Sequence, residues 1–103
     1  MNYKKLPKLR KELKELRQKG GIKPRELEVL ARALGRELHF RGSEPNWVSN
    51  VFRDLSPVSI PHHGNKDLNK FTARAILDQL ENDVERFEEL MADSNESNGD
   101  DDV

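Results

Sequence analysis

The sequence predicts a single α+β domain. Two observations support this prediction: three segments repeat apolar residues at helical spacing, and three consecutive shorter segments alternate between apolar and polar residues. The segments follow the order helix, helix, strand, strand, strand, helix, and 103 residues suffice for one small domain but not for two. We therefore expect an α-β-β-β-α domain over residues 23–91, preceded by an added amphipathic helix within residues 1–22.

The added helix is expected over residues 5–19. Pro7 suits a first-turn position, and Gly20-Gly21 ends the periodic segment. A helix of this length is marginal alone in water, so its leucine stripe must be buried against something. The stripe either packs on the domain itself or binds a partner chain or a second copy. If the stripe binds a partner, Leu9, Leu13 and Leu16 are the partner-binding residues.

The domain begins with a second helix from Pro24 to about Gly35, which occupies the position of a helix-ending glycine. Alternation then predicts strands in residues 36–41, 46–52 and 58–61, on connections short enough for an antiparallel meander. Both helices of the domain must cover one face of this sheet to form a core. The opposite, open face is expected to carry His39, Arg41, Trp47, Ser49 and Ser59.

The last helix is expected over residues 70–91, where seven apolar residues recur at helical spacing. Asn69 or Asp67 is placed to cap its start. Residues 92–103 have no periodicity and almost no apolar content, so we expect a disordered acidic tail there.

Composition excludes several function classes. The absence of cysteine excludes a disulfide framework, a thiolate metal site and a thiol nucleophile. No apolar run approaches the length of a signal-peptide core or a membrane span, so we expect a cytoplasmic protein without membrane association. The adjacent His62 and His63 lack a carboxylate at ligand spacing, so no metal site is expected, and no cofactor signal is present.

The net charge of −1 conceals a strong asymmetry. Residues 1–53 hold 14 Lys and Arg against 6 Asp and Glu, whereas residues 54–103 hold 4 against 13, which gives net charges of +8 and −9. A basic half attracts phosphates, and an acidic tail screens it or repels non-specific nucleic acid. The alternative is that these runs are ordinary solvated helix faces.

Six short motifs, in order, resemble the HicA family of small toxins. They read KPREL, LARALG, RGSEPNW, SIPHHG, KDLNK and FTARAILDQL; the motifs lie within residues 23–80, and the resemblance covers residues 23–84. The resemblance implies a double-stranded-RNA-binding-domain-like fold, an RNA target, RNA cleavage and a HicB-like antitoxin as protein partner. The family's proposed catalytic histidine follows the Gly-Ser turn, and Glu44 occupies that position here.

Glu44 therefore has three interpretations. RNA cleavage through the 2′-hydroxyl needs a base and an acid, and an ionised glutamate is an accepted base. It also repels the phosphate, by roughly 1 kcal/mol at 4 Å in water and about 4 kcal/mol at a surface-like dielectric; Arg41, Ser43 and the turn amides offset part of this. The second interpretation is a weakened or silent site, and the third is a different alignment of the turn. His39, five residues before Glu44, is not expected to replace the missing histidine.

The remaining site predictions concern RNA and protein contacts. Lys70 and Arg74 are one helical turn apart near the start of the last helix, a reasonable phosphate site. Trp47 has three possible roles: to stack a base, to anchor a protein partner or to pack against its neighbours. We include Trp47 with Leu9, Leu13 and Leu16 among the expected partner-binding residues. The expected RNA-binding residues are Arg41, Ser43, His63, Lys66, Lys70 and Arg74.

Overall fold

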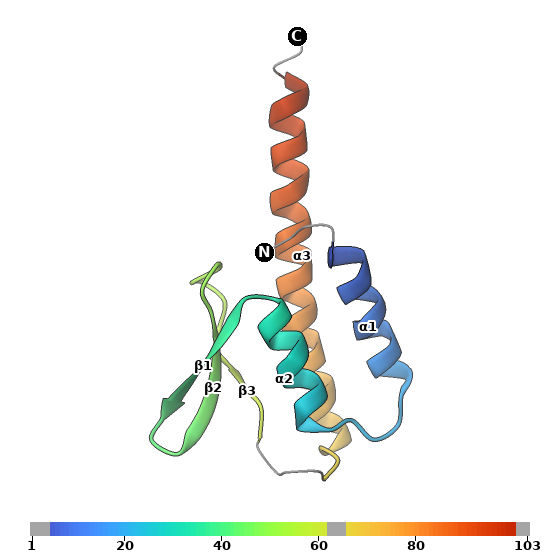
Figure 1. The fold of residues 1–103 in the computed structure, drawn as a ribbon, viewed down its shortest axis with the longest axis vertical. Helices are drawn as coiled ribbons and strands as arrows, with labels where there is room; N and C mark the ends of the chain where they lie inside the picture. Colours follow the sequence, from blue (N-terminus) through green and yellow to red (C-terminus); the bar gives the residue numbers. More distant parts are fainter. Residues whose placement is uncertain (1–4, 62–65, 101–103) are drawn as a thin grey trace.

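The computed structural model describes residues 5–61 and 66–100, with the backbone alone for residues 93–100. It contains three helices and a three-stranded antiparallel sheet with strand order β1-β2-β3. The elements follow the order α1, α2, β1, β2, β3, α3, which confirms the predicted α+β class and the predicted sequence of elements. Figure 1 shows α2 and α3 on one side of the sheet, with α1 on the far side of α3.

The added helix α1 (Leu6–Gln18) packs lengthwise along the last helix. Leu9 and Leu13 are 4% and 1% exposed within the chain, and Leu16 is partly buried against the same core. Arg10 strengthens the contact by donating hydrogen bonds of 3.0 and 2.7 Å to the Glu88 carboxylate. The prediction that Leu9, Leu13 and Leu16 bind a partner is therefore wrong, because the chain's own α3 buries the stripe.

Helix α2 (Pro24–Ala33) begins at the predicted proline. The Lys23 backbone N–H donates to the Glu26 carboxylate at 3.1 Å, which satisfies one of the free amide groups at the helix start. Gly35 follows the helix with a φ of 83°, as expected for a helix-ending glycine, and the chain then enters β1.

Strands β1 (Arg36–Arg41) and β2 (Glu44–Ser49) form a hairpin around Gly42-Ser43. Gly42 has a φ of 65°, which suits the first central position of a type II′ turn. The short β3 (Val58–Ser59) pairs with β2 through Asn46 and Trp47. The pairing of Arg41 with Glu44 sets the register of the hairpin, and so decides which side chains point to which face of the sheet (the phase of each strand).

That phase reverses the predicted faces of the second strand. Trp47 lies opposite Leu38 and is only 2% exposed, and Ser49 is buried as well. The prediction that Trp47 and Ser49 lie on the open face is therefore wrong. The strand begins at Glu44, and a shift of one residue in phase moves every side chain to the other face.

The last helix α3 (Lys70–Asp100) is longer than predicted. The Asn69 side chain accepts a 2.8 Å hydrogen bond from the Phe71 amide and so caps the start, as one of the two predicted candidates. The expected disordered tail is helical up to Asp100, while residues 101–103 lie outside the described part. No proline interrupts the segment, and its first glycine is Gly99, so the backbone hydrogen bonds continue.

A buried ion pair connects the sheet to α3. The Arg36 guanidinium donates hydrogen bonds of 2.7 and 2.8 Å to both carboxylate oxygens of Asp83, and the two side chains are each 1% exposed. The same guanidinium donates to the carbonyls of Trp47 and Ser56 at 2.8 and 3.2 Å. One cation therefore holds β1, β2, the loop before β3 and α3 in place.

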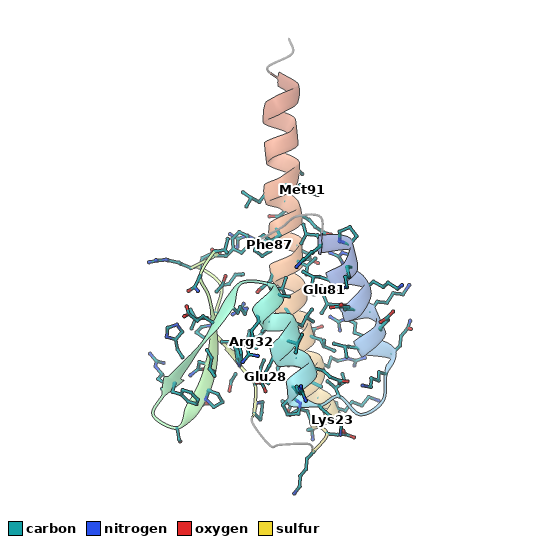
Figure 2. All side chains as sticks on the ribbon, in the orientation of Figure 1. Lys23, Glu28, Arg32, Glu81, Phe87 and Met91 are labelled. Carbon is teal, nitrogen blue, oxygen red and sulfur yellow. The ribbon has the colours of Figure 1, made fainter. Side chains whose placement is uncertain are left out.

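Aromatic packing closes the core at its upper end. Phe87 extends from α3 (Figure 2) and meets Phe52 edge-to-face, with ring centroids 4.8 Å apart and an interplanar angle of 65°. Phe52 therefore packs against the core, although it lies beyond the end of β2.

Candidate nucleic-acid interface

The hairpin places three of the functional candidates on one face. Cross-strand partners in an antiparallel pair point to the same side, so Arg41 and Glu44 share the face opposite the helices, and so do His39 and Asn46. His39 and Glu44 are diagonal neighbours, for which side chains lie about 7–8 Å apart. Arg41, His39 and Glu44 are all exposed. The sequence expectation that His39 lies too far from Glu44 missed this diagonal relation.

The open face therefore contains a carboxylate, an imidazole and a guanidinium. His39 Nε2 lies 3.8 Å from the Glu37 carboxylate on the same face. Ser43, a predicted RNA contact, is exposed in the turn between the strands. This arrangement offers a base, an acid and a cation to a phosphodiester laid across the hairpin.

Trp47 is not available to this face. Its ring lies among the core residues, and the Arg32 guanidinium of α2 covers it at 5.1 Å from the ring centroid. Figure 2 shows Arg32 extending from α2 toward the sheet. Trp47 is only 2% exposed, so neither a base nor a protein partner can contact its ring. The prediction of Trp47 as a partner-binding residue is therefore wrong.

A second group of candidates surrounds the start of α3. Lys66, Lys70 and Arg74 are exposed, and none forms a hydrogen bond or ion pair with the part of the chain that the structure describes. Beside them, Phe71 is 79% exposed, an unusual placement for a phenylalanine. The helical spacing of the sequence leaves Phe71 off the apolar face of the last helix, and this was the available signal for it.

The cations at this site contrast with three arginines elsewhere in the structure. Arg10, Arg36 and Arg86 each form an ion pair with an acidic residue. The hydrogen bond from Arg86 lowers the pKa of Asp54, and that from Arg10 lowers the pKa of Glu88. Lys66, Lys70 and Arg74 differ from these three arginines in having no acidic partner within the described residues.

The start of α3 also borders a cavity. The cavity has a volume of about 290 Å³ and lies between the end of α1, the turn that follows it and the first turns of α3. Lys70 and Arg74 line it together with Arg17 and Lys19, two basic residues that sequence reasoning did not connect with the site. No local signal links them, since their meeting depends on the packing of the first helix on the last.

Several expectations lie outside these two surfaces. His63 lies outside the described residues. Among the side chains that the structure describes, in residues 5–61 and 66–92, no three His, Asp or Glu come together as a candidate metal site. None of the described helices has the length and apolar character needed to cross a membrane.

In comparisons with known proteins, no family model matches the sequence, and no curated protein or solved structure matches it significantly.

Proposed function

We propose that this protein binds RNA as a HicA-like toxin with a double-stranded-RNA-binding-domain-like fold, and that a HicB-like antitoxin neutralises it. The order α2, β1, β2, β3, α3 supports the fold assignment. The motifs from KPREL to FTARAILDQL support the family resemblance. The RNA-binding part of the proposal rests on one structural observation, the charge distribution along α3.

The charges of α3 oppose the helix dipole. A helix favours acidic residues in its first turn and basic residues in its last, by about 0.3–1 kcal/mol each. In α3 the first turn has no acidic residue and instead carries Lys70, followed one turn later by Arg74. Acidic residues dominate the helix from Asp78 onward. A helix that gives up local stability to concentrate positive charge at one end is suited to a polyanion such as RNA.

The aromatic ring of Phe71 adds a contact that charge alone does not provide. An exposed ring beside cations is the combination by which proteins bind single-stranded RNA, because bases stack on the ring while the cations contact the backbone. The hairpin turn and the start of α3 lie at the same end of the molecule (Figure 1), so a single RNA strand can contact both. A protein-interaction function based on Leu9, Leu13 and Trp47 has little support, since these side chains are buried within the chain.

Charge reversal tests RNA binding. We expect the triple variant Lys66→Glu, Lys70→Glu, Arg74→Glu to bind single-stranded RNA far more weakly than the native protein. Its salt dependence should also fall, by roughly 0.7 in log–log slope for each lost phosphate contact. The measurement is fluorescence anisotropy over a salt series starting near 50 mM.

The matched control is Lys8→Glu, Lys11→Glu, Lys14→Glu, which makes the same change in net charge on the exposed side of α1. If both triple variants weaken binding equally, net charge and not the α3 site determines affinity. Absence of native binding at low salt would contradict the proposed function itself.

A second candidate function, RNA cleavage, is favoured by the shared face of Glu44, Arg41 and His39. In this reaction Glu44 removes the 2′-hydroxyl proton, and the 2′-oxygen attacks phosphorus. The bond from phosphorus to the 5′-oxygen then breaks as protonated His39 gives that oxygen a proton. Arg41 balances the phosphate charge that Glu44 repels. The products are a 2′,3′-cyclic phosphate and a 5′-hydroxyl.

We expect Glu44→Gln to abolish RNA cleavage while leaving RNA binding intact, because the amide cannot accept the proton. General base catalysis typically contributes about 10²–10⁴-fold to a rate. The assay follows a labelled RNA and identifies the cyclic phosphate end. Glu15→Gln, on the exposed side of α1 and away from the hairpin, is the control and should cleave normally. Intact RNA with both the native protein and Glu44→Gln would leave RNA binding as the only function.

A further inference from the structure

The cavity beside α3 combines an apolar floor with a basic rim. Its floor consists of buried side chains from the loops and from α3. Its rim carries four cations, two from the end of α1 and the residues just after it and two from the start of α3. The floor residues are Ile22, Leu68, Ala73 and Leu77. The rim residues are Arg17, Lys19, Lys70 and Arg74. Its volume, about 290 Å³, is near the lower limit of roughly 300 Å³ for small-molecule pockets.

Two loops that approach closely hold the cavity open. The Leu68 amide donates a 2.7 Å hydrogen bond to the Ile22 carbonyl, and this contact joins the segment before α3 to the segment after α1. Gly21 has a φ of 71°, and a Cβ placed there would lie 2.6 Å from Asp67 Oδ2. The Lys23 ammonium lies 3.3 Å from Asp67 Oδ1, and Figure 2 places Lys23 at this end of the molecule. These contacts join the two segments that form the walls of the cavity.

The rim charges are only partly neutralised. Arg17 donates a 2.7 Å hydrogen bond to Asp78, and Lys19 forms an ion pair with Glu26. Lys70 and Arg74 have no such partner among the described residues. Two uncompensated positive charges match a phosphomonoester, which carries about −1.5 to −2 at pH 7, better than an internal phosphodiester with its single charge.

We propose that this cavity binds the phosphomonoester of a terminal nucleotide, with the nucleoside against the apolar floor. The proposal rests on the proposed RNA binding and specifies which part of an RNA the site recognises, namely a phosphorylated end. Lys70 and Arg74 contact the phosphate, while Ile22 and Leu77 contact the nucleoside. A free mononucleotide presents the same chemistry, so the experiment separates the two sources.

The test compares three single-stranded RNAs of one sequence, with a 5′-phosphate, a 3′-phosphate or hydroxyls at both ends. We expect one phosphorylated RNA to bind the full-length protein at least about tenfold more tightly than the hydroxyl form. This factor corresponds to one charge-assisted hydrogen bond. Lys70→Gln and Arg74→Gln should each remove this preference. The matched control Lys66→Gln, an exposed lysine outside the cavity, should weaken all three RNAs equally and preserve it.

Competition with adenosine monophosphate and with inorganic phosphate identifies the source. Displacement of the phosphorylated RNA by the mononucleotide but not by inorganic phosphate supports the nucleoside contact; equal displacement by both overturns that contact. Equal binding of the three RNAs, without mononucleotide binding, overturns the cavity proposal and leaves RNA binding intact. If no RNA binds but the mononucleotide does, in a Lys70-dependent manner, the proposed function fails and the cavity recognises the free nucleotide.

Discussion

At the scale of single residues, the most consequential feature is a charge inside the core. Arg36 is buried and forms hydrogen bonds with Asp83, Trp47 and Ser56, so every direction in which its guanidinium points has an acceptor. No described buried side-chain nitrogen or oxygen lacks a hydrogen-bond partner. A buried ion pair of this kind orients the elements that it joins, and its value for stability depends on both partners being present.

We expect Asp83→Ala to lower the free energy of unfolding by about 3–5 kcal/mol, because it leaves the buried Arg36 guanidinium without its counter-charge. The measurement is the urea midpoint and slope. The double variant Arg36→Met, Asp83→Leu should recover much of the loss, since apolar side chains of similar volume remove the unpaired charge. Asp54→Asn, which removes the partner of the exposed Arg86, is the control and should change the midpoint little. A large effect of Asp54→Asn and none of Asp83→Ala would contradict this account.

At the scale of elements, α1 acts as an integral part of the domain. Its leucines contribute to the main core, and its arginines reach three acidic residues of α3. The hydrogen bond from Arg10, together with the nearby positive charge, lowers the pKa of Glu88. A depressed carboxylate pKa means that the folded state holds the proton less tightly than the unfolded state does.

The stability of the α1–α3 contact should therefore fall in acid. The contribution of Glu88 is fully present above its unfolded pKa, near ~4.3, and is lost as pH falls through the lower folded pKa. We expect Glu88→Gln to reduce stability at neutral pH and to flatten its decline below about pH 5. The effect should stay below about 1 kcal/mol, because both side chains are more than a third exposed.

Urea unfolding at several pH values measures this effect. Glu15→Gln on the exposed side of α1 serves as the control, since this carboxylate forms no ion pair within the described chain. A native pH profile that Glu88→Gln leaves unchanged would contradict the assignment.

At the scale of the whole molecule, the charge asymmetry of the sequence is partly neutralised by internal ion pairs and partly left at the surface. Part of it is neutralised when the basic first half packs on the acidic α3, as in the pairs formed by Arg10, Arg17 and Arg36. The unneutralised part includes the cations at the start of α3, which lies at the same end of the molecule as the hairpin turn (Figure 1). The net charge of each half therefore does not predict where the unneutralised positive charge lies on the surface.

The sequence predicted those features that depend on neighbouring residues. Helical periodicity, Pro24, Gly35 and Asn69 gave the number, order and caps of the elements, because these signals act within a few residues. The inward face of β2 could not be obtained in this way. It depends on pairing with Arg41 across the turn, and both possible phases bring apolar residues to one face.

The site was predicted incompletely for a related reason. Lys66, Lys70 and Arg74 follow one another in sequence, and the resemblance to a known family indicated the hairpin turn. The cavity joins residues 17–22 to residues 68–77, and the buried pair joins Arg36 to Asp83. Such contacts arise from three-dimensional packing, for which one sequence contains no periodic signal.

The hydrogen bond between Leu68 and Ile22 has a consequence for synthesis on the ribosome. The cavity needs the turn after α1 and the first turns of α3, so its walls meet only when residue 77 has left the exit tunnel. Domains form as units once their core residues have emerged, and here α3 supplies core residues as late as Phe87. A nascent chain therefore lacks this cavity until the first turns of α3 have emerged, although α1 and the turn after it are synthesised earlier.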